Sequence, residues 1–229
     1  EAFRGSLIDG MFSKEKAENC QIGSFMQAQS AATRAILSSR SVSEEDRQRV
    51  IDQLMVTVVI HEVGHTLGLT HNMKASSSIS LDTLKEPDGL TTGSIMDYVP
   101  ANFVPTDGVR KQYYQTEIGP YDYWAIEFGY HPSLDESSAE TERVRALLSR
   151  STDPALAFGN DVEVVQYNLG VDPRTLLYDM SNDLVGWTAL QAENINAAIA
   201  RLEVTHTKSD EPFQDVRNTL NSLLSNRRG

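Results

Sequence analysis

The segment HEVGHTLGLTHN, from His61 to Asn72, holds three of the five histidines of the chain within eleven residues. On a helix, His61 and His65 are one turn apart and project from the same face, so both imidazoles can bind one metal ion. Glu62 is offset by about 100° around the helix axis, which lets its carboxylate reach a metal-bound water without being a ligand itself. This spacing predicts zinc chemistry with Glu62 as the general base.

Gly68 and His71 extend the pattern to HExxHxxGxxH. Glycine adopts left-handed backbone angles without steric cost, so Gly68 can end the helix and turn the chain back toward the same ion. Three neutral imidazoles, from His61, His65 and His71, leave the fourth position of a tetrahedral zinc ion open to water, which is the catalytic arrangement. The alternative is a set of core histidines in a chance match, because HExxH alone is a weak signal. The longer pattern favours one catalytic Zn²⁺ per chain.

Downstream, the segment SIMDY (residues 94–98) contains a methionine and, two residues later, a tyrosine. HExxHxxGxxH followed by such a segment resembles the metzincin clan of zinc endopeptidases. The resemblance implies that Met96 forms the apolar floor beneath the zinc ion in a Met turn. It also implies that Tyr98 is a catalytic residue, which ligates zinc or stabilises the tetrahedral intermediate. The alternatives are an ordinary core methionine and a packed tyrosine whose hydroxyl faces solvent.

Asn72, directly after the third histidine, is not the Glu, Ser or Asp that marks the astacin, matrixin and adamalysin branches. With the segments HNMKASSS and SIMDYVPANF, it is more similar to a large bacterial family of multidomain zinc-dependent metzincin-like peptidases. The segment DYWAIEFGY (residues 122–130) resembles the C-terminal helix of several metzincins, in which an acidic residue precedes an Ala-Ile pair. It implies structural roles behind the active site for Trp124, Ala125 and Ile126. The resemblance covers about residues 58–130 and is loose over the last hundred residues.

Helical patterns surround these segments. Residues 24–40 are free of Gly and Pro, and Ser43 followed by acidic residues predicts the start of a helix that reaches Leu67. Its buried face is predicted from apolar spacing to contain Val50, Ile51, Leu54, Met55, Val58 and Val59. Further helices are expected over residues 119–130, where Pro120 begins and Gly129 ends the helix, and over 137–150, 173–185, 187–203 and 212–226.

The remaining segments are less regular. Residues 72–93 are polar and predict a long surface loop. Only residues 162–169 alternate like a strand.

These patterns predict a mainly α (α+β) fold: a metzincin-like catalytic domain fragment with a long active-site helix, the Met turn and a helical C-terminal extension. We expect residues 1–131 to form the catalytic core and residues 132–229 the extension packed on it. Metzincins place a sheet, whose edge strand binds substrate, ahead of the active-site helix. Here only residues 3–8 resemble a strand remnant, so that the N-terminal sheet is expected to lie largely outside this chain, in the upstream part of a longer parent protein.

Composition excludes several classes of partner. A net charge of -12 and a pI near 4.8 disfavour contact with phosphate backbones, so no nucleic acid is expected to bind.

The single cysteine, Cys20, cannot form an intrachain disulfide and is expected to be a small, partly buried hydrophobe. No apolar run approaches the length of about 18 residues that a membrane helix needs. Surface or capping roles are expected for His131 and His206, which lack partners at ligand spacing.

We therefore predict a zinc-dependent endopeptidase that hydrolyses polypeptide substrates through a zinc-bound water activated by Glu62. The alternative function is a zinc-stabilised, non-catalytic binding or structural module. The presence of Glu62 argues against it, because a structural site needs no general base and prefers a fourth protein ligand. Export to the periplasm, the cell surface or the exterior is implied by the resemblance alone.

Overall fold

The computed structural model describes residues 22–40, 42–133, 137–161, 163, 172–206 and 213–226. Every regular element within these ranges is helical, and no β-strand occurs among them. The longer helices are α3 (Ile22–Ser39), α4 (Glu44–Thr66), α6 (Pro120–Tyr130), α7 (Ser137–Ser149), α9 (Leu184–His206) and α10 (Phe213–Asn226). The shorter ones are η1 (Ala75–Ser78), α5 (Leu81–Lys85), η2 (Arg150–Thr152) and η3 (Pro154–Leu156). The predicted mainly helical class is confirmed for this part of the chain.

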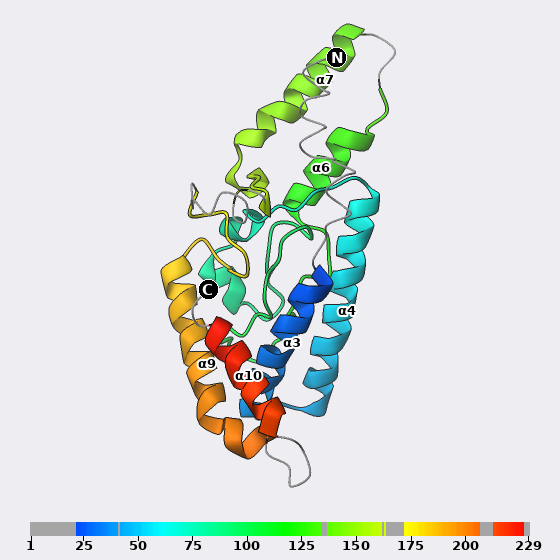
Figure 1. Cartoon of the computed structure of the whole chain (residues 1–229). Coiled ribbons are helices and arrows are strands. Elements are labelled where there is room, and N and C mark those ends of the chain that lie inside the picture. The colour runs from blue at the N-terminus through cyan, green and yellow to red at the C-terminus, as the bar shows by residue number, and fades with distance from the viewer. Residues whose placement is uncertain are drawn as a thin grey trace.

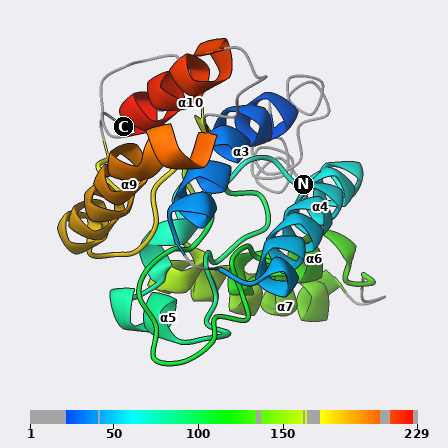
Figure 2. The same cartoon turned by 90° about the horizontal axis from the view of Figure 1, so that it is seen from below.

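Figure 1 shows α6 and α7 at one end of the molecule and α3, α9 and α10 at the other, with α4 along one side between them. Seen from below in Figure 2, α3, α9 and α10 lie side by side, and their mutual contacts are the most extensive between helices. Buried apolar side chains fill the space between them, including Ile36, Ile195 and Leu223. Tyr114, from the segment that follows α5, is fully buried in the same core. This packing stabilises the end of the molecule opposite α6 and α7.

A second core lies around α6. Trp124 and Ala125 are buried there, Ile126 is partly buried, and Met96 packs in the same cluster. The Trp124 indole N–H donates to the Leu147 carbonyl of α7 at 3.0 Å, which joins the two helices. Pro120 begins α6 as predicted, but the prediction that Gly129 ends it was wrong, since the helix continues to Tyr130. His131 caps this helix through its backbone N–H, and its side chain is exposed.

The start of α4 is confirmed at its predicted cap, because the Ser43 hydroxyl accepts a hydrogen bond from the Asp46 N–H. The predicted buried face of this helix is confirmed only in part, since Leu54 and Val58 pack against buried clusters. Val50 is buried, but an apolar row on the next face is half exposed: Ile51, Met55, Val59 and Val63. On its buried side α4 meets irregular chain through polar contacts, such as that of the Thr57 hydroxyl with the Gln115 carbonyl at 2.7 Å. Apolar spacing identified the helix and half of the residues on its packed face.

Residues 72–93 do not form the predicted surface loop. Asn72, Ser76 and Thr91 are fully buried, and the segment includes η1 and α5. Its polar groups have internal partners: the Ser76 N–H, for example, donates to the Asp97 carboxylate at 2.8 Å. Polar side chains can line a buried segment when hydrogen bonds satisfy them. The segment is therefore largely buried at its two ends, whereas α5 lies at the edge of the molecule, as Figure 2 shows.

The helix predicted over residues 173–185 is absent, and α9 begins only at Leu184. Tyr178 and Ser181 have positive φ angles of 70° and 78°, which a helix excludes. The backbone here bonds to a distant part of the chain instead of to itself: the Tyr178 N–H donates to the Tyr98 carbonyl at 2.9 Å. Cys20 and the strand expected over residues 3–8 lie outside the described residues, as does nearly all of the strand expected over 162–169. Within the described ranges no helix is long and apolar enough to cross a membrane.

Candidate metal centre

The last turns of α4 carry His61 and His65, whose ring centroids are 4.8 Å apart. Helix geometry alone places them on one face, because they are four positions apart in the chain. His61 is completely buried, whereas His65 is partly buried. Glu62, next to His61 on the helix, is exposed.

The chain leaves α4 through a glycine turn. Gly68 has φ = 84°, and its N–H donates to the His65 carbonyl at 2.9 Å while the Leu69 N–H donates to the Gly64 carbonyl at 3.1 Å. This pair of hydrogen bonds is the Schellman arrangement, which needs a left-handed residue after the helix. The turn brings His71 back to α4, with its ring centroid 4.9 Å from that of His65 and 5.3 Å from that of His61.

Each of the three imidazoles is held at its Nδ1 atom by an acceptor. His61 Nδ1 lies 2.8 Å from the Ile95 carbonyl oxygen, and His65 Nδ1 lies 2.9 Å from that of Leu69. His71 Nδ1 lies 3.2 Å from a carboxylate oxygen of Asp161. Acceptors at Nδ1 require a proton there, so the lone pair of each neutral ring is at Nε2. The orientation that a metal ligand needs is thus set by the groups behind the rings.

The donor set fits a metal ion. One ring nitrogen from each of His61, His65 and His71 lies within 4.8 Å of the others. His65 Nε2 is buried and has no hydrogen-bond partner in the described part of the chain. Burial, with the neighbouring His71 as the second cause, lowers the pKa of His61 to about 3, so that this ring is neutral at pH 7. Neutral imidazoles with converging lone pairs suit zinc.

Met96 packs directly under the helix between the two histidines. It is fully buried, and its sulfur occupies the space that a Cβ atom on Gly64 would take. The turn that carries it is closed by a hydrogen bond from the Asp97 N–H to the Ser94 carbonyl at 3.3 Å. Gly64 therefore permits this contact, although the HExxH pattern does not specify a glycine at this position.

Asp122 of α6 binds the same turn through its side chain. Its carboxylate accepts hydrogen bonds from the Ser94 hydroxyl at 2.5 Å, the Ile95 N–H at 2.9 Å and the Gly119 N–H at 2.7 Å. Burial raises the pKa of this carboxyl. Because Ile95 also provides the carbonyl behind His61, Asp122 connects α6 to the orientation of that imidazole. The acidic residue that precedes the Ala-Ile pair thus acts on the turn rather than on the rings.

Tyr98 lies within the histidine cluster. Its hydroxyl is 3.0 Å from His71 Nε2, and only 4% of the residue is exposed. Its ring centroid is 4.8 Å from that of His71 and 5.4 Å from that of His61. A hydroxyl in this position does not face solvent, so that the alternative of a packed tyrosine with a solvated hydroxyl is excluded.

Asp161 and Asn72 were missed as site residues by the sequence analysis. Asp161 lies ninety residues after His71 in the chain, and no local spacing connects them. Asn72 was noted only as a departure from the metzincin branches, and it is fully buried beside the cluster. His131 lies outside the cluster, as expected.

Comparison with known proteins decides the family. A family model described as Met-zincin matches residues 43–229. The chain belongs to the Met-zincin family. The match extends beyond residues 58–130, which the motifs covered, and includes the last hundred residues. Searches of curated proteins and of solved structures gave no match.

The extent of the match agrees with the packing of this Met-zincin domain. Asp161, which contacts His71, and the core residues of α9 and α10 all come from the part after residue 131. The family and the three-histidine cluster together indicate a zinc-binding, metzincin-like domain.

Proposed function

We propose that this protein is a zinc-dependent endopeptidase. The observation that carries the proposal is the convergence of three imidazoles beside a buried tyrosine hydroxyl and an exposed glutamate on the same helix. His61, His65 and His71 would hold one zinc ion through Nε2. When bound, zinc supplies Lewis-acid chemistry, which acidifies a water molecule and polarises the scissile carbonyl. Polypeptide is the substrate class that the family implies.

Two side chains of the chain perform the remaining steps. Glu62 accepts the proton of the attacking water and returns it to the leaving amine, as a general base and then a general acid. The Tyr98 hydroxyl donates a hydrogen bond to the carbonyl oxygen as it gains negative charge, and this stabilises the transition state more than the bound substrate. Because Tyr98 is buried, its side chain is already ordered before substrate binds, so that little conformational entropy is lost on binding.

The alternative is a zinc-stabilised module without catalysis. A structural zinc site normally has four protein ligands. Within the described residues, the histidine cluster includes no fourth Cys, Asp, Glu or His. An open coordination position next to an exposed carboxylate favours catalysis over a structural role.

The substrate-binding edge and the location of the protein remain predictions. The sheet that orients substrate in metzincins does not occur among the described elements, and we propose that an upstream segment of a longer parent provides it. Export from a bacterial cell is likewise proposed on the family resemblance.

The decisive experiment is casein hydrolysis by the zinc-loaded protein, by the same protein after chelation, and by Glu62→Gln. We expect chelation to abolish hydrolysis, and Glu62→Gln to lower it by about 10²- to 10⁴-fold at unchanged zinc content, because the amide cannot accept the proton. Glu193→Gln, at an exposed position of α9, is the matched control and should keep full activity. Hydrolysis by Glu62→Gln within a few-fold of the parent protein would remove Glu62 from the mechanism.

A further inference from the structure

His71 differs from the other two histidines in the group behind it. His61 and His65 are held by backbone carbonyls, whereas His71 Nδ1 meets the Asp161 carboxylate at 3.2 Å. The His71 side chain is 6% exposed and that of Asp161 is 32% exposed, so the contact lies at the border of the protein interior. A carboxylate is the stronger acceptor, since hydrogen bonds to an ionised group are roughly twice as strong as neutral ones.

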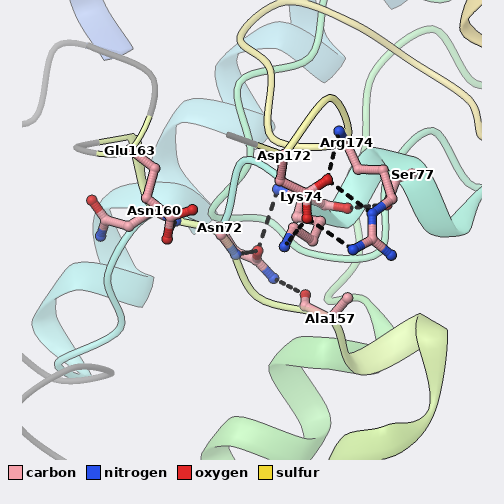
Figure 3. A network of polar contacts seen from close by, with 9 residues as sticks. Asn72, Lys74, Ser77, Ala157, Asn160, Glu163, Asp172 and Arg174 are labelled. Carbon is pink, nitrogen blue, oxygen red and sulfur yellow. Dashed lines mark hydrogen bonds and ion pairs between the residues drawn. The ribbon is translucent and has the colours of Figure 1, made fainter. Parts of the chain in front are cut away.

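The segment that carries Asp161 is fastened to the residues directly after His71. The Asn72 side chain donates from Nδ2 to the Ala157 carbonyl at 3.0 Å and accepts at Oδ1 from the Gly159 N–H at 3.1 Å. The Met73 N–H donates to the Gly159 carbonyl at 2.7 Å. We call residues 157–161 the strap. Figure 3 shows Asn72 reaching its Ala157 end.

The other side of the strap is closed by residues 172–175. A Cβ atom on Gly159 would collide with the Thr175 side chain and come within 3.1 Å of Lys74 Cε. The Lys74 ammonium is itself paired with Asp172 at 2.8 Å, and Asp172 also binds Arg174, as Figure 3 shows. The strap therefore has little freedom to withdraw from His71.

We propose that Asp161 is a positioning residue of the metal centre, which orients His71 toward the ion and increases the electron density at its Nε2. The proposal rests on the proposed zinc function of the three histidines. A carboxylate behind a ligating imidazole holds the ring in one orientation and one tautomer and makes it a stronger ligand. The site then combines two rings on a rigid helix with a third, after the glycine turn, whose orientation depends on a distant segment.

The same geometry assigns a role to Asn72. Its amide both donates to the strap and accepts from it. An ionised Asp or Glu carboxylate would only accept, and a Ser side chain is shorter and has one polar atom for both roles. Asn72 also joins the strap to the turn below the site, because its N–H donates to the Met96 carbonyl at 3.0 Å. The residue after the third histidine thus brings the strap to the metal centre.

The test is zinc affinity, measured by competition with a chromophoric chelator in the full chain. We expect Asp161→Ala to weaken zinc binding by about 10- to 100-fold, and Asp161→Asn, which keeps an acceptor but not the charge, to weaken it less. Asp88→Asn, at a surface carboxylate paired with the exposed Lys111, is the control and should bind zinc like the parent protein. Zinc binding by Asp161→Ala within two-fold of the parent would overturn the proposal.

Two further measurements separate positioning from a general loss of structure. The thermal midpoint of the metal-free Asp161→Ala protein should match the parent, while the visible absorption spectrum of its cobalt(II) form should change. A lowered midpoint with an unchanged cobalt spectrum would show a merely structural role and overturn the proposal. If the parent chain itself binds no zinc, both the proposed function and this inference fail. If the parent binds zinc and Asp161→Ala binds it with the same affinity, the inference alone fails.

A double-mutant cycle tests the role of Asn72. If Asn72 acts through the strap, Asn72→Ala combined with Asp161→Ala should weaken zinc binding no more than the stronger of the two single changes, because coupled residues are not additive. Full additivity would overturn the assignment of Asn72.

Discussion

The hydroxyl of Tyr98 lies 3.0 Å from Nε2 of His71, the ring nitrogen opposite the one held by Asp161. The two residues are 27 positions apart in the chain, and both are buried. This contact places an O–H donor beside the nitrogen that would bind the metal ion. It connects the Met96 turn to the third histidine.

Tyr98→Phe is expected to lower kcat by about 10²- to 10³-fold and to change KM little, because a donor to the developing oxyanion acts in the transition state. The measurement is steady-state kinetics on one casein-derived peptide. Tyr123→Phe, at an exposed position of α6, is the control and should leave both constants unchanged. Equal kinetics for Tyr98→Phe and the parent would leave Tyr98 with a packing role only.

His71→Ala is expected to abolish stoichiometric zinc binding, since two imidazoles do not complete the set of three protein ligands that a catalytic zinc site needs. Elemental analysis of the purified proteins should give one zinc per parent chain and substoichiometric zinc in the variant. His131→Ala, whose side chain is exposed outside the cluster, should retain one zinc. Undiminished zinc in His71→Ala would contradict the ligand assignment.

Gly68→Ala is expected to reduce the free energy of unfolding by about 1–2 kcal/mol, the cost of a left-handed angle for a residue with a Cβ atom, and also to weaken zinc binding. Gly108 offers a matched control, because it too has a positive φ, of 100°, in a place where a Cβ would meet nothing within 4 Å. Gly108→Ala should therefore have the same backbone cost without loss of zinc affinity. Urea unfolding and chelator competition on both variants distinguish the two effects. Parent-like zinc affinity in Gly68→Ala would show that His71 reaches the site without this turn.

The buried carboxyls of Asp179 and Asp97 predict a pH dependence of stability. Burial raises the pKa of Asp179 to about 6, from a usual value of 3.8, and burial, with the nearby Asp179 carboxyl as the second cause, raises the pKa of Asp97. Between pH 3.8 and about pH 6, Asp179 keeps its proton in the folded protein but has lost it in the unfolded chain. The free energy of unfolding therefore falls as the pH rises from about 4 to 6.

Asp179→Asn removes this titration. Compared with the parent at the same pH, the variant should gain about 3 kcal/mol in unfolding free energy between pH 4 and pH 7, an order-of-magnitude value from two units of pKa difference. Urea unfolding at pH 4, 5, 6 and 7 provides the comparison, and Asp88→Asn serves as the exposed control. A difference between variant and parent that stays constant over this range would refute the prediction.

Much of the histidine site was predictable from the sequence because it depends on neighbours in the chain. Four-residue spacing on a helix places His61 beside His65, and a glycine that tolerates φ = 84° returns His71 to them. Ser43 marked the start of α4 for the same reason, since its hydroxyl bonds to a backbone group three residues away. Interactions of this range are set by backbone geometry and residue type, whatever the rest of the fold.

Only the tertiary structure decided which groups stand behind the rings and which surfaces are buried. The Asp161 carboxylate reaches His71 because the strap is bonded to Asn72, and no periodicity connects residues ninety positions apart. The local pattern of residues 173–185 predicted a helix, yet Tyr178 is left-handed and its N–H donates to the Tyr98 carbonyl. In these places long-range hydrogen bonds outweigh local propensity, because a helix preference amounts to less than about 1 kcal/mol per residue while a buried polar group without a partner costs about 1–3 kcal/mol.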